Sequence, residues 1–548
     1  MKRKYLLFLL LVLSLIPLLD LFNLGLPITH DGQDHVVRIA NFYKNLAEGN
    51  LIPRWGANLN WGYGHPILMF LYPLPSYIAS LFHFLGFSFV DSTKIIFGLS
   101  FALSGIFMFL WIKEIWGEMA GFAAGLLYMF APYRFVDLYV RGAIGECWAF
   151  VWPPLILYFL LKLSKGYSYR YIAGGSFSLA ALILSHNALS LMFLPIIFGY
   201  MVYLVCLSKK KLLFTPYHYI GAGFTILLGF GLSAFFWFPS FFEGKYTLRD
   251  IVTKDNVTGF ENFTRLVWSP WNYGGTGSFS VQVGIIQWLV IIFSPLLVFL
   301  LWRKKAKIWI FLLFLYFSFW LAILFITPVS KGIYLSTPFL KNFQFAWRFL
   351  SLAIFPPAVF MGALIYLLPQ RLKAFTICCL LFVTLLLNRD YWHAQRFLIK
   401  PESFYTGIYP GTTDTGESSP RWSVRFMEYP AKTHLEVIEG QATIEELKRT
   451  STGHQYQIVV SKKARLRENT LYFPGWNVLV DGRLTTIEFQ DPQNRGLMTF
   501  FVNSGRHIVS VQFKETKLRL FADAVSIASL ISLLFYSILK KKLWSLFR

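Results

Sequence analysis

About twelve apolar runs, each long enough to cross a bilayer as a helix, constrain this chain more than any other feature. The hydrocarbon core of a membrane is about 30 Å thick, and a helix needs roughly 20 apolar residues to span it. A chain with so many runs is predicted to fold as a polytopic α-helical membrane protein. We expect the spans at residues 5–25, 94–113, 118–134, 146–163, 170–186, 188–207, 217–239, 281–302, 308–327, 347–368, 372–388 and 519–539.

Short basic clusters separate these runs, and the formal net charge is +23. In a soluble protein that charge would suggest nucleic acid, but clusters between apolar runs are typical of cytoplasmic loops that face anionic lipid. We therefore expect the cell membrane, and no nucleic acid, as a partner. The first run is too long for a signal peptide and lacks a small-residue cleavage site, so we expect an uncleaved anchor. Both termini become cytoplasmic when every cluster is placed inside, at residues 2–4, 162–170, 209–211, 303–307, 371–373 and 540–542.

One further apolar stretch, residues 65–87, does not fit the count of crossings. It contains Pro66, Pro73 and Pro75, which disfavour a regular spanning helix. If it crossed, every later basic cluster would fall outside. We expect it to lie along the outer interface as a helix. The alternative is a true span that is compensated elsewhere in the chain.

The region 389–518 has a different pattern, because its apolar residues alternate with polar ones, as in "HQYQIVV" and "RHIVSVQF". Alternation is typical of strands, and Asp481-Gly482 between two such runs predicts a tight hairpin turn. We expect a small extracytoplasmic β-sandwich of antiparallel strands. The chain then divides into a transmembrane domain (1–388), the β-rich domain (389–518), and a last helix with a basic cytoplasmic tail (519–548).

Two carboxylates follow the first apolar run in the stretch "PITHDGQDHVVR". Asp31 and Asp34 lie three residues apart, one helical turn, so they share a helix face. Asp31 lies near the predicted start of this helix, where a carboxylate can be a simple N-cap. The alternative is that the pair works at the membrane surface, as a base or as ligands of a divalent metal ion (Mg or Mn).

Other costly polar residues lie at the same predicted outer edge of the membrane. Each has a plain structural explanation alone: a helix cap, a turn, or a side chain that extends to the headgroups. Together they predict a patch of carboxylates, guanidinium groups and a histidine on one side of the membrane. The members besides the two aspartates are Arg141, Glu146, His186, Asn187, Glu243, Lys245 and Arg348.

A lipid-borne phosphate ester is the substrate that such a patch suits. Transfer of a sugar from a polyprenyl phosphate needs a carboxylate to deprotonate the acceptor hydroxyl. It also needs Arg or His to stabilise the departing phosphate, and apolar grooves for the prenyl chain. No nucleoside takes part, so neither a Walker A loop nor a Rossmann fingerprint is required.

The order of these segments resembles a known superfamily, the integral-membrane glycosyltransferases of the C-type fold. A span, an acidic residue that opens a helix, and a Pro-rich segment ("HPILMFLYPLPSY") follow one another in both. The resemblance implies a polyprenyl-phosphate sugar donor and a catalytic acid in the first outer loop, the position of Asp31. A strict DxD is absent, because Asp31 and Asp34 have a DxxD spacing.

Four short motifs, "LYVRGAIGE", "LSHN", "FPSFFEGKY" and "FQFAWRFL", together with the late "YFPGWNVLVDG" and "SGRHIVSVQF", are similar to a narrower group. This group consists of bacterial and archaeal membrane proteins labelled 6-pyruvoyl-tetrahydropterin-synthase-related. The label does not imply pterin chemistry here, because the zinc-binding histidine set of a soluble pterin synthase is not recognisable.

The leading hypothesis is an inverting glycosyltransferase that moves a sugar from a polyprenyl-phosphate donor to an extracytoplasmic glycan, lipid or protein. Asp31 would be the base, and Asp34 would assist it or bind metal. The basic residues would hold the phosphate, and Glu146 and Glu243 would orient groups. The β-rich region would bind carbohydrate through exposed aromatics such as Trp422 and Trp476, or serve as a packing lid. The alternatives are a transporter or flippase, and a non-catalytic assembly factor for lipid-linked envelope glycans.

Overall fold

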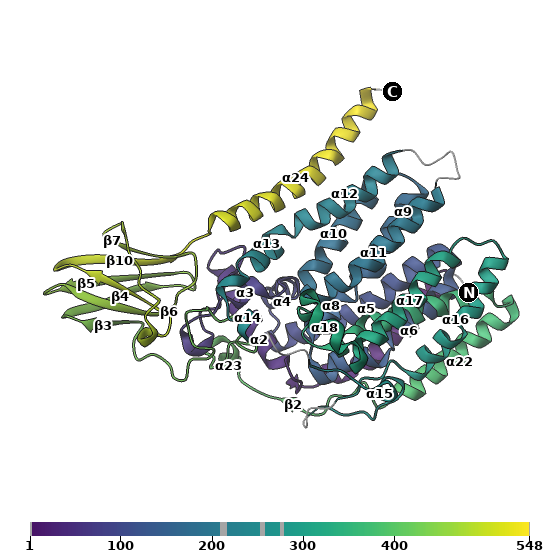
Figure 1. Cartoon of the computed structure of the whole chain (residues 1–548), viewed down its shortest axis with the longest axis horizontal. Helices are drawn as coiled ribbons and strands as arrows, with labels where there is room; N and C mark the ends of the chain where they lie inside the picture. Colours follow the sequence, from purple (N-terminus) through teal and green to yellow (C-terminus); the bar gives the residue numbers. More distant parts are fainter. Residues whose placement is uncertain (1–2, 209–215, 253–257, 275–278, 547–548) are drawn as a thin grey trace.

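Long apolar helices make up most of the molecule (Figure 1). The structure is a computed structural model that describes residues 3–208, 216–252, 258–274 and 279–546. Within those ranges nine helices are long and apolar enough to cross a membrane, or up to eleven if each of two bent pairs is one span. The expected span at 170–186 is α10 (Tyr169–Ser185), whose 17 residues reach about 25 Å. The chain is a polytopic helical membrane protein, as predicted.

The single spans and the bent pairs match the other apolar runs. The single spans are α1 (Arg3–Leu15) with η1 (Ile16–Phe22), α5 (Phe89–Trp116), α8 (Ile144–Ala149) with α9 (Trp152–Lys165), α11 (Asn187–Ser208), α16 (Ile285–Arg303), α17 (Trp309–Ile326), η6 (Ala346–Phe349) with α20 (Leu350–Ala353) and α21 (Phe355–Leu367), α22 (Gln370–Asn388), and α24 (Lys517–Leu546). The bent pairs are α6 (Glu118–Met129) with α7 (Pro132–Phe135) and the π-helical η3 (Val136–Arg141), at 51°, and α12 (Pro216–Leu232) with α13 (Ala234–Phe242), at 66°.

A proline explains the break between α6 and α7. Ala131 precedes Pro132 and adopts extended backbone angles, φ −69° and ψ 135°, because the proline ring disfavours the helical region for the residue before it. The chain then resumes as a short helix and a π-helical turn that ends at Arg141. The break therefore delivers Arg141 to the end of the bent pair.

The Pro-rich stretch 65–87 forms two short helices rather than a crossing. They are α3 (Ile67–Phe70) and α4 (Leu74–Phe84). Leu71 between them is extended, with ψ 139°, and Pro73 begins the second helix as its N-cap. Neither helix is long enough to span a bilayer. The expected single helix is therefore two short helices, and their position along the outer interface stays a prediction.

Two antiparallel sheets form the predicted β-sandwich at one end of the molecule (Figure 1). Buried residues of both sheets share one apolar core, and in β5 every second side chain is buried, as the alternation predicts. Asp481 and Gly482, at φ 52° and 79°, form the predicted two-residue turn, since Val480 pairs with Arg483. The sheet orders are β3 (Leu435–Glu439)–β6 (Ala464–Leu471)–β9 (Leu497–Val502), and β4 (Ala442–Arg449)–β5 (Gly453–Val460)–β10 (Gly505–Phe513)–β7 (Trp476–Val480)–β8 (Arg483–Thr485).

Residues 389–434 form a mostly irregular segment that returns along the first loop. Its strand β2 (Phe397–Leu398) pairs with β1 (Leu26–Pro27), and α23 (Glu402–Thr406) packs on α2 (Gly32–Ala47). The first loop and this segment therefore reach the site together. The other short helices are η2 (Asn60–Gly62), η4 (Gly244–Tyr246), α14 (Arg249–Val252), α15 (Phe263–Val267), η5 (Pro328–Ser330), α18 (Lys331–Ser336), α19 (Pro338–Lys341) and η7 (Pro492–Asn494).

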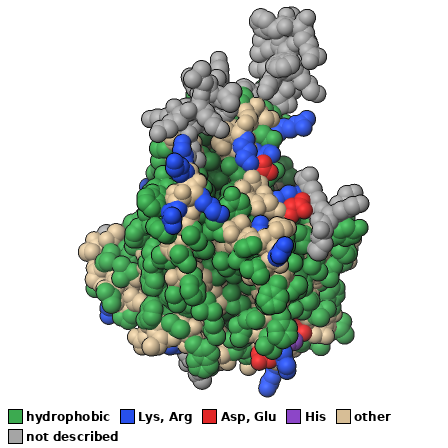
Figure 2. Space-filling view, turned by 90° about the vertical axis from the view of Figure 1, so that its right-hand side faces the viewer, with side chains coloured by type: hydrophobic (Ala, Val, Ile, Leu, Met, Phe, Trp, Pro, Cys, Tyr) green, Lys and Arg blue, Asp and Glu red, His purple; other side chains and the backbone are tan. Residues whose placement is uncertain are grey.

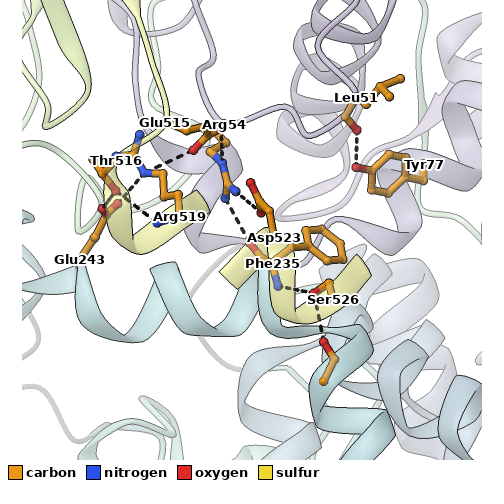
Figure 3. Close-up of polar contacts among 11 residues, drawn as sticks. Leu51, Arg54, Tyr77, Phe235, Glu243, Glu515, Thr516, Arg519, Asp523 and Ser526 are labelled. Carbon is orange, nitrogen blue, oxygen red and sulfur yellow. Dashed lines mark hydrogen bonds and ion pairs between the residues drawn. The ribbon is translucent and has the colours of Figure 1, made fainter. Parts of the chain in front are cut away.

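A buried ion-pair network joins the first loop, the end of α13 and α24 (Figure 3), and its Arg519 also donates to the Pro474 carbonyl of the sandwich at 2.6 Å. Arg54 contacts Glu515 and Asp523, each at 2.7 Å, and Arg519 contacts Glu243 at 2.8 Å. Both arginines are buried. Because an unpaired buried charge is costly, this network fixes the sandwich against the helices.

The two ends of the chain lie on the side of the helical part that faces away from the sandwich (Figure 1). Figure 2 shows that side: Lys and Arg gather in patches on a largely hydrophobic surface. Of the predicted basic clusters, 209–211 and Lys2 lie outside the described residues. All four cysteines are free thiols.

Candidate functional site

The buried carboxylate of Glu146 is the centre of a polar cluster at the junction of several helices. Its Oε1 lies 2.8 Å from Arg141 Nη1 and 3.0 Å from Arg348 Nε. Its Oε2 accepts a hydrogen bond of 2.9 Å from the Tyr133 hydroxyl. One carboxylate therefore holds two guanidinium groups at one point, one from the preceding turn and one from a residue 202 positions later in the chain.

Each member of the cluster comes from a place where a helix starts, ends or breaks. Arg141 ends the π-helical turn η3, Glu146 lies in the first turn of α8, and Arg348 lies in η6. His186 is the residue between α10 and α11. Such positions bring polar groups to the ends of apolar helices, which explains why the sequence places single charges at the edges of its apolar runs.

Two glycines of "LYVRGAIGE" allow the close approach of neighbouring segments. Gly142 has φ +65°, and a Cβ there would lie 2.3 Å from Thr29 Oγ1. A Cβ on Gly145 would lie 2.3 Å from the Tyr72 ring and 2.7 Å from the carbonyl oxygen of Ser185. The first glycine admits the loop that carries Asp31, and the second admits the segment that carries His186.

The guanidinium groups of Arg141 and Arg348 are fixed in place, but some of their N–H donors make no hydrogen bond. Arg141 Nη1 also contacts Asp137 Oδ1 at 2.6 Å, and Arg348 Nη1 donates to the Phe343 carbonyl and to Gln344. No acceptor in the described part of the chain is hydrogen-bonded to Arg141 Nε and Nη2 or to Arg348 Nη2, and these atoms are not enclosed. An anion beside the cluster would find charged donors that are already oriented.

Asp31 lies at the edge of this cluster with an exposed side chain. Its backbone N–H donates to the Arg141 carbonyl at 2.9 Å. Asp31 occupies the N-cap position of α2 but makes no capping hydrogen bond; the Gly32 N–H donates to Thr29 Oγ1 instead, at 3.1 Å. The simple capping explanation for Asp31 is therefore wrong.

Asp34 lies one turn further along α2 and is engaged by the returning segment. Tyr409 donates a hydrogen bond of 2.8 Å to its carboxylate. Burial raises the pKa of Asp34, while the Tyr409 hydrogen bond and the nearby Arg38 oppose that rise. Asp34 thus faces a less hydrated environment than Asp31.

His186 faces Glu146 from the break between α10 and α11. The Leu189 N–H donates to Nδ1 at 3.2 Å, so Nδ1 is an acceptor and Nε2, which lies 3.9 Å from Glu146 Oε1, carries the proton. The ring stacks on Tyr72 with centroids 5.1 Å apart. The neighbouring Asn187 instead donates to the Phe70 carbonyl at 2.9 Å, and so ties α11 to α3.

Two residues expected in the patch have their contacts elsewhere. Glu243 is buried, and it accepts hydrogen bonds from Thr516 and Arg519 at 2.8 Å in the network of Figure 3. Lys245 is exposed, with its ammonium 5.1 Å from the Tyr246 ring centroid. The structure does not bring either into contact with Glu146, because equal depth in the membrane does not fix lateral position.

The expected carbohydrate-binding tryptophans are not free aromatic surfaces. Trp476 is buried and packs edge-on against Trp55, with centroids 5.4 Å apart, so its predicted exposure is wrong. Trp422 is half-buried and stacks on Tyr246. Both rings help to pack the sandwich against the loops of the helical domain.

The carboxylates present do not form a metal site by themselves. Among the described residues no three His, Cys, Asp or Glu side chains are arranged to hold a metal ion. Asp34, the expected second ligand, is hydrogen-bonded to Tyr409. We therefore derive no chemical step through a metal, and metal dependence stays a prediction.

Some polar residues of the site were not singled out from the sequence. Tyr133 lies at the end of an apolar run, Asp137 lies just beyond it, and Arg38 lies on α2, where it donates to His35 and to Thr413. The spacing of Asp137 and Arg141, four residues apart, was the available signal for Asp137. For Tyr133 and Arg38 the sequence carries no clear signal, since their partners are distant in the chain.

Comparison with known proteins agrees with the narrower resemblance. The family model described as "6-pyruvoyl-tetrahydropterin synthase related domain; membrane protein" matches residues 68–398, more than half of the chain. The chain belongs to this family. The matched residues contain Arg141, Glu146, His186 and Arg348, whereas Asp31 precedes them.

One curated relative and two solved structures define the wider neighbourhood. An uncharacterized protein of Lactococcus lactis subsp. cremoris is 27% identical over 240 residues, 42% of this chain and 39% of that protein. The mycobacterial arabinofuranosyltransferase AftD is 12% identical with a TM-score of 0.46, over 74% of this chain and 28% of that one. The Archaeoglobus fulgidus oligosaccharyltransferase is 12% identical with a TM-score of 0.43, over 79% of this chain and 62% of that one.

These two solved structures are C-type-fold glycosyltransferases, the superfamily that the order of segments resembles. The chain spans less than two thirds of the length of each of these three proteins. At such identities and TM-scores the likeness carries no argument about activity.

Proposed function

We propose that this protein is a membrane glycosyltransferase that moves a sugar from a polyprenyl-phosphate donor to an extracytoplasmic acceptor, with inversion. One observation carries the proposal. Glu146 holds Arg141 and Arg348 with unused N–H donors at the end of the helices, and Asp31, free of any capping bond, is tied by its backbone to Arg141. A base and an anion-binding pair thus lie next to each other.

The orientation in the membrane follows from the charges. Lys and Arg gather on the side away from the sandwich (Figure 2), and basic loops favour the cytoplasm. Both termini are then cytoplasmic. The sandwich and the Glu146 cluster are extracytoplasmic, where lipid-linked sugars are consumed without nucleotides.

The chemical step is a single displacement. The Asp31 carboxylate takes the proton of the acceptor hydroxyl while the hydroxyl oxygen attacks the anomeric carbon of the donor sugar. The bond from that carbon to the phosphate oxygen breaks, and its electron pair leaves with the polyprenyl phosphate. The free N–H groups of Arg141 and Arg348 stabilise the phosphate charge, and attack from the opposite face inverts the configuration.

The remaining residues position the reacting groups. Glu146 is a positioning residue, because it fixes both guanidinium groups, and Asp34 shapes the surroundings of Asp31 from the next turn of α2. His186 directs its Nε2 proton toward Glu146. This division keeps Asp31 as the one acid–base group that contacts substrate.

The experiment is transfer of labelled hexose from a panel of undecaprenyl-phosphate hexoses to short oligosaccharides by the full chain in nanodiscs. Asp31→Asn is expected to slow transfer by about 10²–10⁴-fold, the usual contribution of a general base. Its melting temperature is expected to stay at the wild-type value, because the side chain makes no capping bond. Asp390→Asn, an exposed aspartate, is the matched control.

Two further readouts separate the alternatives. Binding of undecaprenyl phosphate alone is expected to weaken in Arg348→Met, and the anomeric configuration of the product shows inversion by NMR. Wild-type turnover by Asp31→Asn, or movement of the lipid-linked sugar across the bilayer without transfer, would contradict the proposal. Repeating the assay with EDTA, then with Mg²⁺ or Mn²⁺, decides the metal prediction.

A further inference from the structure

A polar cavity, separate from the Glu146 cluster, lies between the helical domain and the β-sandwich. Its volume is about 240 Å³. The far end of α2, the turn after residue 56, the segment 408–431 and strands of both sheets contribute to its wall. Its polar and aromatic lining consists of Lys44, Asn58, Trp61, His434, Arg449, Thr450 and Asn469.

The charged side chains that line this cavity are basic, although two of them, Arg449 and His434, are each paired with a carboxylate outside the lining, Glu468 and Glu446. Lys44 and Arg449 line it, and none of the described residues that line it is an Asp or a Glu. Lys44 donates to Asn58 at 3.0 Å, and among the described residues its acidic neighbour Glu48 acts on it without forming an ion pair. Arg449 contacts the buried Glu468 at 3.3 Å, which anchors the guanidinium in the wall. The cavity therefore favours a ligand that carries negative charge.

The backbone presents Trp61 to the cavity in an unusual way. Asn60, Trp61 and Gly62 have φ of 54°, 59° and 83°, all in the left-handed region. The N–H groups of Asn60 and Trp61 donate to the carbonyls of Gly411 and Tyr409 at 2.8 and 2.9 Å, and these bonds hold the turn. Left-handed backbone angles are costly for a tryptophan, and such strained residues cluster at functional sites. The strain therefore indicates that the indole ring is needed at this position.

We propose that this cavity binds an anionic sugar unit, one that bears a phosphate or a carboxylate. The flat indole face suits the C–H face of a pyranose ring, and Lys44 and Arg449 suit its charge. Asn469 Nδ2 already donates to Thr433 and Glu436, so this residue offers a sugar hydroxyl its Oδ1 as an acceptor. Asn58 Nδ2 donates to the Thr406 carbonyl, so this residue offers its second N–H. A cavity of about 240 Å³ admits one or two sugar units rather than a whole glycan.

The inference rests on the proposed function in one respect, since it takes this sugar to be a remote unit of the acceptor. Lys44 lies 13 residues beyond Asp31 along α2, and a helix rises about 1.5 Å per residue, so the cavity is roughly 20 Å from the base. Binding energy from such a remote unit can orient the reacting end of the acceptor.

The test is saturation-transfer NMR and equilibrium dialysis with the full chain in nanodiscs and no donor lipid. The probes are glucose 6-phosphate, glucuronate, glucose and inorganic phosphate. One or both anionic sugars are expected to bind at least about tenfold more tightly than glucose or phosphate, the loss that one charge-assisted hydrogen bond typically produces. Comparison of the first two probes shows whether a phosphate or a carboxylate is preferred.

Two variants and a control make the test specific. Lys44→Gln removes the free cation, and Trp61→Gly removes the ring while relieving the left-handed backbone, so that variant is expected to fold. Each is expected to weaken binding of the anionic sugar about tenfold, whereas Lys462→Gln, an exposed lysine outside the cavity, leaves it unchanged. If the melting temperature of Lys44→Gln falls, that variant is left out of the comparison. Binding of the anionic sugar by Trp61→Gly then tests the inference.

Equal binding by wild type and both variants would overturn the inference, and so would equal binding of phosphate and anionic sugars. The result is independent of catalysis. If transfer is never observed but Lys44→Gln still weakens sugar binding, the cavity stands and the proposed function fails. If Asp31→Asn abolishes transfer and no sugar binds the cavity, the reverse holds.

Discussion

Replacement of Gly142 by alanine tests whether the loop before α2 must lie against the Arg141 turn. Gly142 has φ +65°, and its Cβ would lie 2.3 Å from Thr29 Oγ1 and 3.0 Å from the Gly32 nitrogen. Neither neighbour can stay in place. The loop that carries Asp31 is therefore expected to move away from the cluster.

The cost follows from the contacts at this point. A non-glycine residue in the left-handed region costs about 1–2 kcal/mol. Three hydrogen bonds are also at risk: Gly32 N–H to Thr29 Oγ1, and those from the N–H groups of residues 30 and 31 to the carbonyls of residues 140 and 141. At about 1 kcal/mol each, the free energy of unfolding is expected to fall by about 2–5 kcal/mol.

The effect on transfer is expected to exceed the effect on stability. A shift of about 1 Å between a base and the groups that bind the leaving group can cost about 10²-fold in rate. Gly142→Ala is thus expected to reduce kcat for transfer by about two orders of magnitude while the protein still folds. Labelled-hexose transfer in nanodiscs and thermal melts measure the two quantities on the same sample.

Gly49→Ala is the matched control. Gly49 follows α2 with φ +91°, and a Cβ there has no atom within 4 Å. The Gly49→Ala variant has the unfavourable backbone conformation without a clash of its Cβ. It is therefore expected to lose about 1–2 kcal/mol of stability and to retain transfer. If Gly142→Ala retained wild-type transfer, or lost no more stability than Gly49→Ala, the loop contact would not position Asp31.

Further predictions concern the sandwich and its junction with the helices. Burial alone would raise the pKa of Glu468, but His454 and Arg449 lower it to about 2. Because its folded pKa lies below the unfolded value, its contribution is present in full above about pH 4.5 and is lost as the pH falls towards 2; melting temperatures from pH 7 to 3 are expected to fall more for wild type than for Glu468→Gln. At the junction in Figure 3, Arg519→Met leaves Glu243 buried without its cation and is expected to cost about 3–5 kcal/mol. Adding Glu243→Gln is expected to recover much of that loss in thermal melts; an additive double variant would show that the two do not interact.

The fold was predictable where one physical constraint dominates. A long apolar run is stable only when the bilayer or the protein interior buries it, so the transmembrane helices were predictable. The alternation of apolar and polar residues in 454–460 predicted a strand in which every second residue is buried. The prolines of 65–87 also made a break predictable, because they divide that stretch into α3 and α4. The irregular path of 389–434 was not predictable, since its contacts are with the first loop and not with its neighbours in sequence.

The site was predictable in part. Arg141, Glu146, His186 and Arg348 stood out because a charge at the end of an apolar run needs a partner, and the structure brings these four together. Glu243 stood out for the same reason but has a different partner. Sequence gives the depth of a charge in the membrane, whereas helix packing decides which charges meet.

The arrangement around Glu146 also explains how two guanidinium groups can be buried side by side. Asp137 and Glu146 offset the charges of Arg141 and Arg348, so the cluster avoids the cost of unpaired buried cations. If the carboxylates occupied every N–H group of the two arginines, no donor would be left for a phosphate. Yet each carboxylate uses only part of the guanidinium groups, and the remaining N–H donors keep fixed directions because the other bonds hold the planes. A phosphate thus meets donors that need no reorganisation, and the carboxylates supply that order.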